Sequence, residues 1–229
     1  NQSSQSSDGT GQARQKERLT LTCSEQPEKE ARAAEILKAA KEGAWSVKDI
    51  EETSVRRAAY APFTTSTLQQ AASNRLGLAP ARTMRIAQNL YEAGHITYMR
   101  TDSTTLSRTA EIEIADFVKA KYGVEYSSPK IYKTKSKSAQ EAHEAIRPTH
   151  IRKESAGGTP EQKRLYGLIF KRAVASQMSD AKIARTKIIA QVSADGKTMP
   201  DFAANGARTE FLGWLKADPE AKGDDVELP

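Results

Sequence analysis

The sequence predicts an α+β protein in which a mainly helical, winged-helix-like domain is inserted into a β-containing arch domain. Strand-like segments lie towards both ends of the chain, at 18–23 and 183–192, and a long stretch with helical periodicity separates them. We therefore expect residues 1–57 to form an N-terminal linker and the first part of the arch domain, and 58–182 to form the helical domain. Residues 183–229 are expected to return to the arch domain and to begin a following one.

The first expected elements are a linker, a strand, a helix and a second strand. Residues 1–13 are rich in Ser, Gln and Gly, a composition typical of linkers. Alternating residues predict a strand at 18–23. A helix is expected over 27–42, because a proline stands at its start and a glycine lies just past its end. Alternation from Trp45 onward predicts the next strand.

The central stretch predicts two short helices followed by an extended segment. Thr64 or Thr65 can cap a helix that ends at Leu76, and a second helix is expected over 80–93, with a glycine after each. The second helix carries apolar residues three or four apart, which predicts a buried face. An extended segment follows at 95–100, and this order of elements resembles a winged helix-turn-helix.

Later elements change from helix to strand. We expect a helix over 107–122, a short helix that ends before Pro148, and a helix over 159–178 that opens with a Thr-Pro-Glu-Gln capping box. From residue 182 the pattern predicts strands, at 183–192 and again at 211–215. These strands are expected to bring the chain back to the arch domain.

Composition favours an anionic partner. The 229 residues include 35 Lys and Arg against 29 Asp and Glu, a net charge of +6. Between residues 53 and 110 the basic residues are all arginines and greatly outnumber the acids, which predicts phosphate contacts along a nucleic-acid strand. A single cysteine, Cys23, excludes an internal disulfide and a cysteine-rich zinc ribbon. No apolar run is long enough to span a membrane, so a cytoplasmic location with chromosomal DNA is expected.

Tyr98 and Arg100 are the candidate catalytic pair. In an extended segment side chains alternate between faces, so these two point the same way, and Asp102 follows them. A tyrosine hydroxyl ordinarily has a pKa of about 10, and it attacks a phosphodiester only if cations stabilise the developing negative charge. The planar guanidinium of arginine supplies such a cation and binds two phosphate oxygens together. Taken alone, however, a tyrosine and an arginine at this spacing are also common on protein surfaces.

Two blocks of sequence resemble a known family. Residues 61–107 contain APFTTSTLQQAASNRLGLAPARTMRIAQNLYEAGHITYMRTDSTTLS, and residues 138–148 contain SAQEAHEAIRP. Both closely resemble the tyrosine-bearing region of bacterial type IA DNA topoisomerases, and the resemblance covers most of 45–229. It implies an ATP-independent isomerase that cleaves single-stranded DNA through a 5′-phosphotyrosyl intermediate, passes a strand and reseals the break. Such an enzyme relaxes negatively supercoiled DNA.

The resemblance assigns roles to individual residues. It implies that Tyr98 becomes joined to the DNA, that Arg100 contacts the scissile phosphate, and that His143 hydrogen-bonds the same phosphate. An imidazole suits this role because its protonation is easily biased near neutral pH. Further DNA contacts are expected from residues around these three, namely Asp102, Ser103, Thr104, Arg147, Arg82 and Arg85.

The sequence lacks part of what this family uses. The family's Toprim domain carries an Asp-x-Asp-x-Glu cluster for magnesium, and no such cluster occurs here, so Mg²⁺ is expected only in that absent domain. The family's Ser-x-Gly-Arg-Val-Gln motif is also missing, and the first residue is Asn. We therefore expect the chain to be part of a larger enzyme, with no metal site or cofactor of its own. In isolation it should bind DNA with little or no turnover.

Two alternatives remain open from the sequence. A non-catalytic winged-helix DNA-binding module would need no nucleophile and would bind duplex DNA in the major groove. A tyrosine recombinase would join the 3′ phosphate, and it needs several spaced Arg and His residues that we cannot arrange in this sequence. The chemical linkage between the protein and labelled DNA distinguishes all three possibilities.

Overall fold

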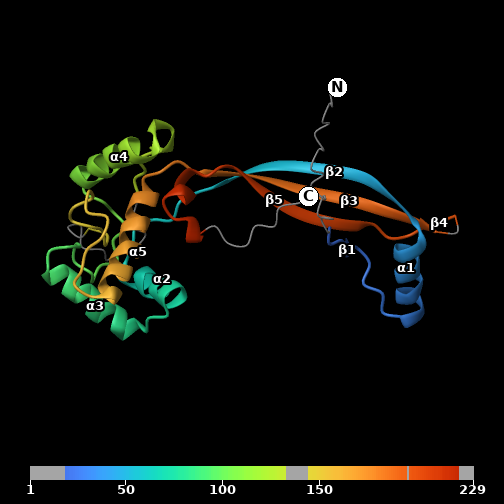
Figure 1. The fold of residues 1–229 in the computed structure, drawn as a ribbon, viewed down its shortest axis with the longest axis horizontal. Helices are drawn as coiled ribbons and strands as arrows, with labels where there is room; N and C mark the ends of the chain where they lie inside the picture. The colour runs from blue at the N-terminus through green and yellow to red at the C-terminus, as the bar shows by residue number, and fades with distance from the viewer. Residues whose placement is uncertain (1–18, 133–143, 195, 222–229) are drawn as a thin grey trace, which may run out of the picture. The chain divides into compact units, whose positions relative to one another are not determined.

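The structure, a computed structural model, contains both helices and strands, which confirms the predicted α+β class (Figure 1). It describes residues 19–132, 144–194 and 196–221. The helices are α1 (Glu30–Glu42), α2 (Thr65–Leu76), α3 (Pro80–Glu92), α4 (Arg108–Tyr122) and α5 (Pro160–Ser176). The strands are β1 (Thr22–Cys23), β2 (Ala44–Arg57), β3 (Ala181–Ala194), β4 (Lys197–Thr198) and β5 (Phe202–Phe211).

The described residues fall into two compact units. Unit 1 comprises 19–52 and 186–207, and unit 2 comprises 53–185 and 208–221, apart from the gaps. The sequence placed boundaries after residues 57 and 182, whereas the structure places them after 52 and 185 and adds a third after 207. Strands β2, β3 and β5 therefore each pass from one unit to the other.

The strands form a sheet in the order β1-β5-β3-β2, with β4 paired to β3 (Figure 1). The pairing of β1 with β5 is antiparallel and places Thr22 opposite Ala203. The pairing of β3 with β4 is also antiparallel. In the described part of the strand expected over 18–23, only Thr22 and Cys23 form a strand.

Helix α1 packs on the part of the sheet that belongs to unit 1. Its residues Ile36 and Ala39 are buried in a cluster with Val192, Met199 and Phe202. Gly43 follows the helix, and its N–H donates to the Ala39 carbonyl at 2.7 Å. A Cβ at this position would lie 2.6 Å from that same oxygen. Only glycine allows this close approach where the helix ends and β2 begins.

Helices α2 to α5 surround the core of unit 2, and α5 is the most buried of them. Helix α5 contacts α2, α3 and α4 along its length. The largest fully buried apolar side chains of this unit come from all four helices and from the segments before, between and after them: Phe63, Leu68, Leu90, Ile96, Met99, Ile114, Ile146, Leu165, Tyr166, Ile169, Met178 and Trp214. Burial of these side chains supplies the main driving force for folding of the unit.

Side-chain caps begin three of these helices. Thr159 and Gln162 form the predicted capping box at the start of α5, with Pro160 at the first helical position. Thr64 and Thr67 form an equivalent box at α2, so Thr64 rather than Thr65 is the cap. Ser107 caps α4 through the N–H of Ala110. These local contacts explain why the predicted helix starts agree closely with the structure.

The strand predicted over 211–215 is wrong beyond Phe211. Residues Gly213–Lys216 form a short 3-10 helix, and Trp214 is buried in the core of unit 2. Gly213 has a φ of +51°, and a Cβ there would lie 2.5 Å from the Ser179 carbonyl oxygen. This left-handed turn follows the end of the strand and places Trp214 in the core of unit 2. Residues 208–221 therefore cluster with the helical unit, whereas the sequence assigned 183–229 to the arch domain and the start of a following domain.

The segment around Pro148 also differs from its prediction. The expected short helix lies partly outside the described residues, and its described part, 144–148, contains isolated bridges instead of a helical turn. Ile146 pairs with Phe63, and Pro148 pairs with Ile96 at the start of the Tyr98 segment. The segment is extended because Ile146 and Pro148 pair with two other parts of the chain. The sequence of the segment itself does not show these pairings. The winged-helix arrangement stays a prediction.

Candidate active site

Alternate residues face solvent in segment 97–102, the candidate catalytic segment that carries Tyr98. The Tyr98 side chain is 44% exposed, whereas Met99 is 1% exposed and belongs to the core of unit 2. Arg100 and Asp102 are also exposed, and Thr101 between them is buried. Tyr98, Arg100 and Asp102 therefore lie on the solvent side of the segment, as the alternation in the sequence predicts, although the segment is not a regular strand.

Thr65, the first residue of α2, holds the backbone on both sides of Arg100. Its hydroxyl lies 2.8 Å from the carbonyl oxygen of Met99 and 3.1 Å from that of Thr101. The same hydroxyl accepts a hydrogen bond from the Thr101 N–H at 2.9 Å. In addition, the Thr65 N–H donates to the Thr101 carbonyl at 2.9 Å. One residue of a core helix thus makes side-chain and main-chain contacts with the candidate catalytic segment.

Thr97 fastens the other end of the segment to residues 145–147. Its hydroxyl donates to the Ala145 carbonyl at 2.7 Å and accepts from the Arg147 N–H at 2.9 Å. The Thr97 N–H donates to the Arg147 carbonyl, also at 2.9 Å. The residue before Tyr98 is therefore joined to the segment that follows position 143.

The Tyr98 ring packs against one neighbouring ring. Tyr91, near the end of α3, meets it edge to face, with centroids 5.3 Å apart and an interplanar angle of 64°. Within the described residues, the Tyr98 hydroxyl has no hydrogen-bond partner, and neither the Arg100 guanidinium nor the Asp102 carboxylate has an ion-pair partner. The phenol oxygen and the cation are therefore both available to a ligand.

Arg147 occupies most of its hydrogen-bonding capacity within the protein. Its Nε lies 3.1 Å from one Glu144 carboxylate oxygen and its Nη2 lies 2.9 Å from the other, while Nη1 donates to the Pro148 carbonyl. Glu144 also accepts from the Ser107 N–H at 2.5 Å. Burial opposes ionisation of Glu144, but the hydrogen bonds from Arg147 and Ser107 outweigh it and lower the pKa of this carboxyl. The expected DNA contact of Arg147 therefore competes with an internal ion pair.

The two hydroxyl residues after Asp102 are less available than the sequence suggested. Ser103 is 4% exposed, and its hydroxyl accepts from the Thr105 N–H at 3.2 Å. A DNA contact by the Ser103 side chain does not fit this burial, because alternation places it on the core side with Met99. Thr104 is half-buried and also has an interaction partner.

Arg82 and Arg85 lie on α3 and are both exposed, but their surroundings differ. The Arg82 guanidinium lies 2.5 Å from the Glu161 carboxylate at the start of α5. Arg85 has no ion-pair partner in the part of the chain that the structure describes. Of the two, Arg85 is the freer cation for a phosphate.

His143 lies outside the described residues, so its position relative to Tyr98 stays a prediction. Three residues that contact the candidate segment or its neighbours were missed in the sequence: Thr65, Thr97 and Glu144. Thr65 was considered there only as a possible helix cap, and Thr97 was given no role. Glu144 follows His143 directly in block 138–148, which resembles the family. This neighbouring position was the only feature of the sequence that could have pointed to Glu144.

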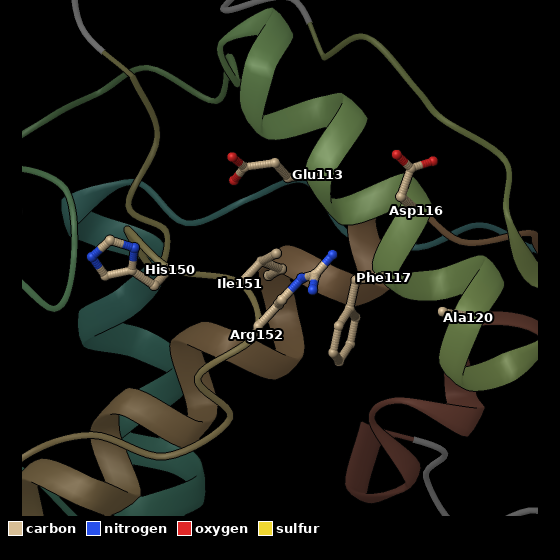
Figure 2. Close-up of a pocket in the computed structure, with 7 residues that line it drawn as sticks. All are labelled: Glu113, Asp116, Phe117, Ala120, His150, Ile151 and Arg152. Carbon is tan, nitrogen blue, oxygen red and sulfur yellow. The ribbon is translucent and has the colours of Figure 1, made fainter.

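A separate cavity of about 570 Å³ lies away from these residues. Figure 2 shows side chains of α4 on one side of it and residues 150–152 on the other. None of its lining residues is among the predicted site residues. Nowhere in the described ranges do three or more His, Cys, Asp or Glu side chains gather as a metal site would need. None of the described helices is long and apolar enough to cross a membrane.

Comparisons with known proteins agree with the resemblance seen in the sequence. The family model described as DNA topoisomerase matches residues 7–229. The chain is 45% identical over 210 residues to DNA topoisomerase 1 of Streptomyces coelicolor. This match covers 86% of this chain and 22% of that protein. It is 45% identical over 195 residues to DNA topoisomerase 1 of a Synechocystis species, covering 80% of this chain and 21% of that protein.

A solved structure is similar along most of the chain. The full-length topoisomerase I from Thermotoga maritima matches with a TM-score of 0.72 and 32% sequence identity. The match covers 91% of this chain and 35% of that one. The chain thus spans about a fifth of the length of the curated relatives described above.

Proposed function

Because this chain belongs to the DNA topoisomerase family, in its bacterial type IA class, we propose that it forms the tyrosine-bearing part of a DNA gate. In this proposal the complete enzyme cleaves one DNA strand, passes another strand through the break and reseals it. Negatively supercoiled DNA is the proposed substrate, and the cytoplasm, with the chromosome, is the proposed location.

One observation carries the proposal. Tyr98, Arg100 and Asp102 face solvent from alternate positions, while the residues between them are buried. The hydroxyl of Tyr98 and the guanidinium of Arg100 are free of hydrogen-bond and ion-pair partners among the described residues. An exposed tyrosine alone is common, but here the phenol shares the solvent side of its segment with a guanidinium that has no ion-pair partner in the described residues. An exposed pair on a firmly held backbone suits attack on a bound phosphate.

The proposed step is a transesterification. The Tyr98 oxygen forms a bond to phosphorus while the bond to the 3′ oxygen of the neighbouring nucleotide breaks. The phenol loses a proton and the departing 3′ oxygen gains one, so a phosphotyrosine and a free 3′ hydroxyl result. The number of phosphoester bonds is unchanged, and resealing is the reverse reaction, so no nucleotide is consumed. Arg100 stabilises the charge that develops on the phosphate oxygens.

The reaction needs groups beyond those described here. We propose that a Toprim segment supplies the opposite side of the site and holds Mg²⁺. The described residues of this chain do not offer a cluster that fits a metal ion, and no step above depends on one. His143 is proposed as a hydrogen-bond donor to the scissile phosphate, on the resemblance of its sequence block alone. Single-stranded DNA is the proposed partner of the exposed arginines.

A cleavage assay tests the proposal. The chain, joined or mixed with a Toprim segment, is incubated with single-stranded DNA labelled at one end and then denatured. A strand labelled at its 3′ end should migrate with the protein, and the same strand labelled at its 5′ end should yield a free, shorter fragment. Tyr98→Phe should abolish the adduct. Tyr91→Phe is the matched control, because it removes a neighbouring exposed hydroxyl and should retain the adduct.

Other outcomes favour the alternatives. Protein attached to the 5′-labelled fragment would indicate a 3′ phosphate linkage, as a tyrosine recombinase forms. Absence of any adduct, with tight binding to duplex DNA of defined sequence, would favour a non-catalytic winged-helix module. Persistence of the adduct in Tyr98→Phe would show that another residue is the nucleophile.

A further inference from the structure

The direction of the Arg100 side chain depends on its backbone. Its guanidinium has no hydrogen bond or ion pair anywhere in the described part of the chain. An exposed arginine has many rotamers, and only the position of its Cα and Cβ limits the region that the guanidinium samples. Whatever fixes the backbone at residues 99–101 therefore also fixes where this cation can meet a phosphate.

Thr65 is the residue that fixes this backbone from α2. A hydroxyl has one proton to donate, and the Met99 carbonyl at 2.8 Å is the nearer of its two acceptors. The oxygen of the same hydroxyl accepts from the Thr101 N–H at 2.9 Å. A single side chain thus bonds the residue before Arg100 and the residue after it.

The main chain of Thr65 adds a further bond. The first N–H groups of a helix have no acceptor within the helix. The Thr65 N–H, at the first position of α2, donates instead to the Thr101 carbonyl at 2.9 Å. The Met99 carbonyl and both the N–H and the carbonyl of Thr101 therefore bond to Thr65 at the start of this helix.

Helix α2 is itself firmly placed. Leu68 and Ala72 are 0% exposed in the core of unit 2, and Thr64 and Thr67 close a capping box at its start. The position of Thr65 is therefore set by core packing, which does not involve Arg100, and the capping box is a separate local contact. A continuous set of contacts connects the core, α2, the Thr65 hydroxyl and the backbone of Arg100.

We propose that Thr65 is a positioning residue for the cleavage step and that it acts through Arg100. This inference rests on the proposed function, in which Arg100 stabilises charge at the scissile phosphate. Loss of the hydroxyl leaves the cation present but allows it to move away from the phosphate. Small misplacements of a catalytic group reduce rates strongly, whereas overall DNA binding depends on many separate phosphate contacts.

The test compares three variants in the chain joined to a Toprim segment. Thr65→Val removes the hydroxyl and keeps the shape, and Thr65→Ser restores the hydroxyl. Thr67→Val is the matched control, because it breaks the capping box of the same helix without touching residues 99–101. We measure the rate of adduct formation with saturating single-stranded DNA, and the Kd for the same DNA by fluorescence anisotropy.

We expect Thr65→Val to lower the saturated cleavage rate at least about tenfold while the Kd changes less than about twofold. Thr65→Ser should recover most of the rate, and Thr67→Val should cleave like the unchanged chain. In an Arg100→Ala background, Thr65→Val should cause little further loss, since the two residues act as one unit. Thermal unfolding of each variant shows whether α2 remains folded.

Several results would overturn the assignment. They are normal cleavage by Thr65→Val, an equal loss in Thr67→Val, no recovery in Thr65→Ser, or additive losses with Arg100→Ala. The Tyr98→Phe variant shows whether the role of Thr65 is wrong or the proposed function itself is wrong. If Tyr98→Phe abolishes the adduct and Thr65→Val does not slow it, the proposed function stands and the role of Thr65 is refuted. If Tyr98→Phe retains the adduct, the proposed function itself fails.

Discussion

Glu144 and Arg147 form a two-point ion pair beside the candidate active site, with nitrogen-to-oxygen distances of 3.1 and 2.9 Å. Glu144 also accepts from the Ser107 N–H at the start of α4, and the Arg147 backbone exchanges hydrogen bonds with Thr97. The pair therefore connects the beginning of α4 to the residue next to Tyr98. Its geometry favours a structural role for Arg147 over the direct DNA contact expected from the sequence.

Replacing Arg147 with alanine should destabilise the fold more than it weakens DNA binding. Removal of the guanidinium leaves a partly buried carboxylate unpaired, which we expect to lower the free energy of unfolding by about 1–3 kcal/mol. Urea unfolding measures this loss. The dependence of single-strand binding on salt concentration should stay unchanged. A direct phosphate contact would instead reduce the slope of log binding constant against log salt by about 0.7, and that result would restore the DNA-binding role.

Arg100→Ala should slow cleavage far more than it weakens binding. The cation is one of several that attract the strand, but in our proposal it is the one placed beside the developing charge. We expect a loss of about a hundredfold in the rate of adduct formation and less than about tenfold in affinity. Arg100→Lys should recover only part of the rate, because an ammonium lacks the planar fork. Equal losses in rate and affinity would contradict the assigned role.

Arg82 and Arg85 offer a matched comparison on one helix. Arg82 is paired with Glu161, whereas Arg85 has no ion-pair partner among the described residues. We expect Arg85→Ala to reduce the salt slope of single-strand binding by about 0.7, and Arg82→Ala to reduce it less. Anisotropy titrations at several salt concentrations measure both slopes. A larger effect at Arg82 would show that DNA displaces Glu161. Neither change should alter the free energy of unfolding by more than about 1 kcal/mol.

The ion pair between Arg75 and Asp218 should be important for the stability of unit 2. The two guanidinium-to-carboxylate distances are 2.8 and 2.6 Å, and the Asp218 side chain is only 2% exposed. Arg75→Ala would leave this buried carboxylate without its partner, and we expect a loss of about 3 kcal/mol in urea unfolding. Glu220 also contacts Arg75 but is 64% exposed, so Glu220→Ala is the control and should cost less than about 1 kcal/mol. Similar losses in both variants would contradict this ranking.

Two phenols, the half-buried Tyr132 and the buried Tyr166, should make the fold sensitive to alkali. Burial raises the pKa of Tyr132 to about 12, with a smaller contribution from Asp180, and burial raises the pKa of Tyr166 to about 12. The unfolded chain ionises these groups near the ordinary value of 10.0. Their stabilising contribution is therefore complete below that pH and is lost as the pH rises towards 12.

Urea midpoints measured at about pH 9 and about pH 11 test this expectation, with the phenolate absorbance as an independent record of ionisation. The unchanged chain should lose stability between the two conditions. Tyr132→Phe should lose less, because a phenyl ring has no proton to release. Tyr132 donates to the Ser176 carbonyl at 3.0 Å, so this variant should also be less stable at neutral pH. An unchanged alkaline loss in Tyr132→Phe would refute the assignment.

Local chemistry explains the parts of the fold that could be predicted. The capping box of Thr159 and Gln162 lies within one turn of α5, and Gly77 and Gly123 follow α2 and α4 directly. Caps and helical periodicity act over a few residues, so they are visible in the sequence. The strand expected at 211–215 failed because Gly213 adopts a left-handed turn against Ser179 and Asp180, which are distant in sequence. The extended form of 144–148 depends likewise on Phe63 and Ile96.

From the sequence alone one could determine the family and the period-two arrangement that places Tyr98, Arg100 and Asp102 on the same side of their segment. The same periodicity places Ser103 on the core side, and the structure agrees. Which cations are free was decided only by the tertiary structure. Arg82 meets Glu161 across 79 positions of the chain, while Arg85 and Arg100 meet no carboxylate in the described residues. Such ion pairs form because packing of the core brings together helices and loops that are far apart in sequence. No local sequence pattern shows which of these residues will meet.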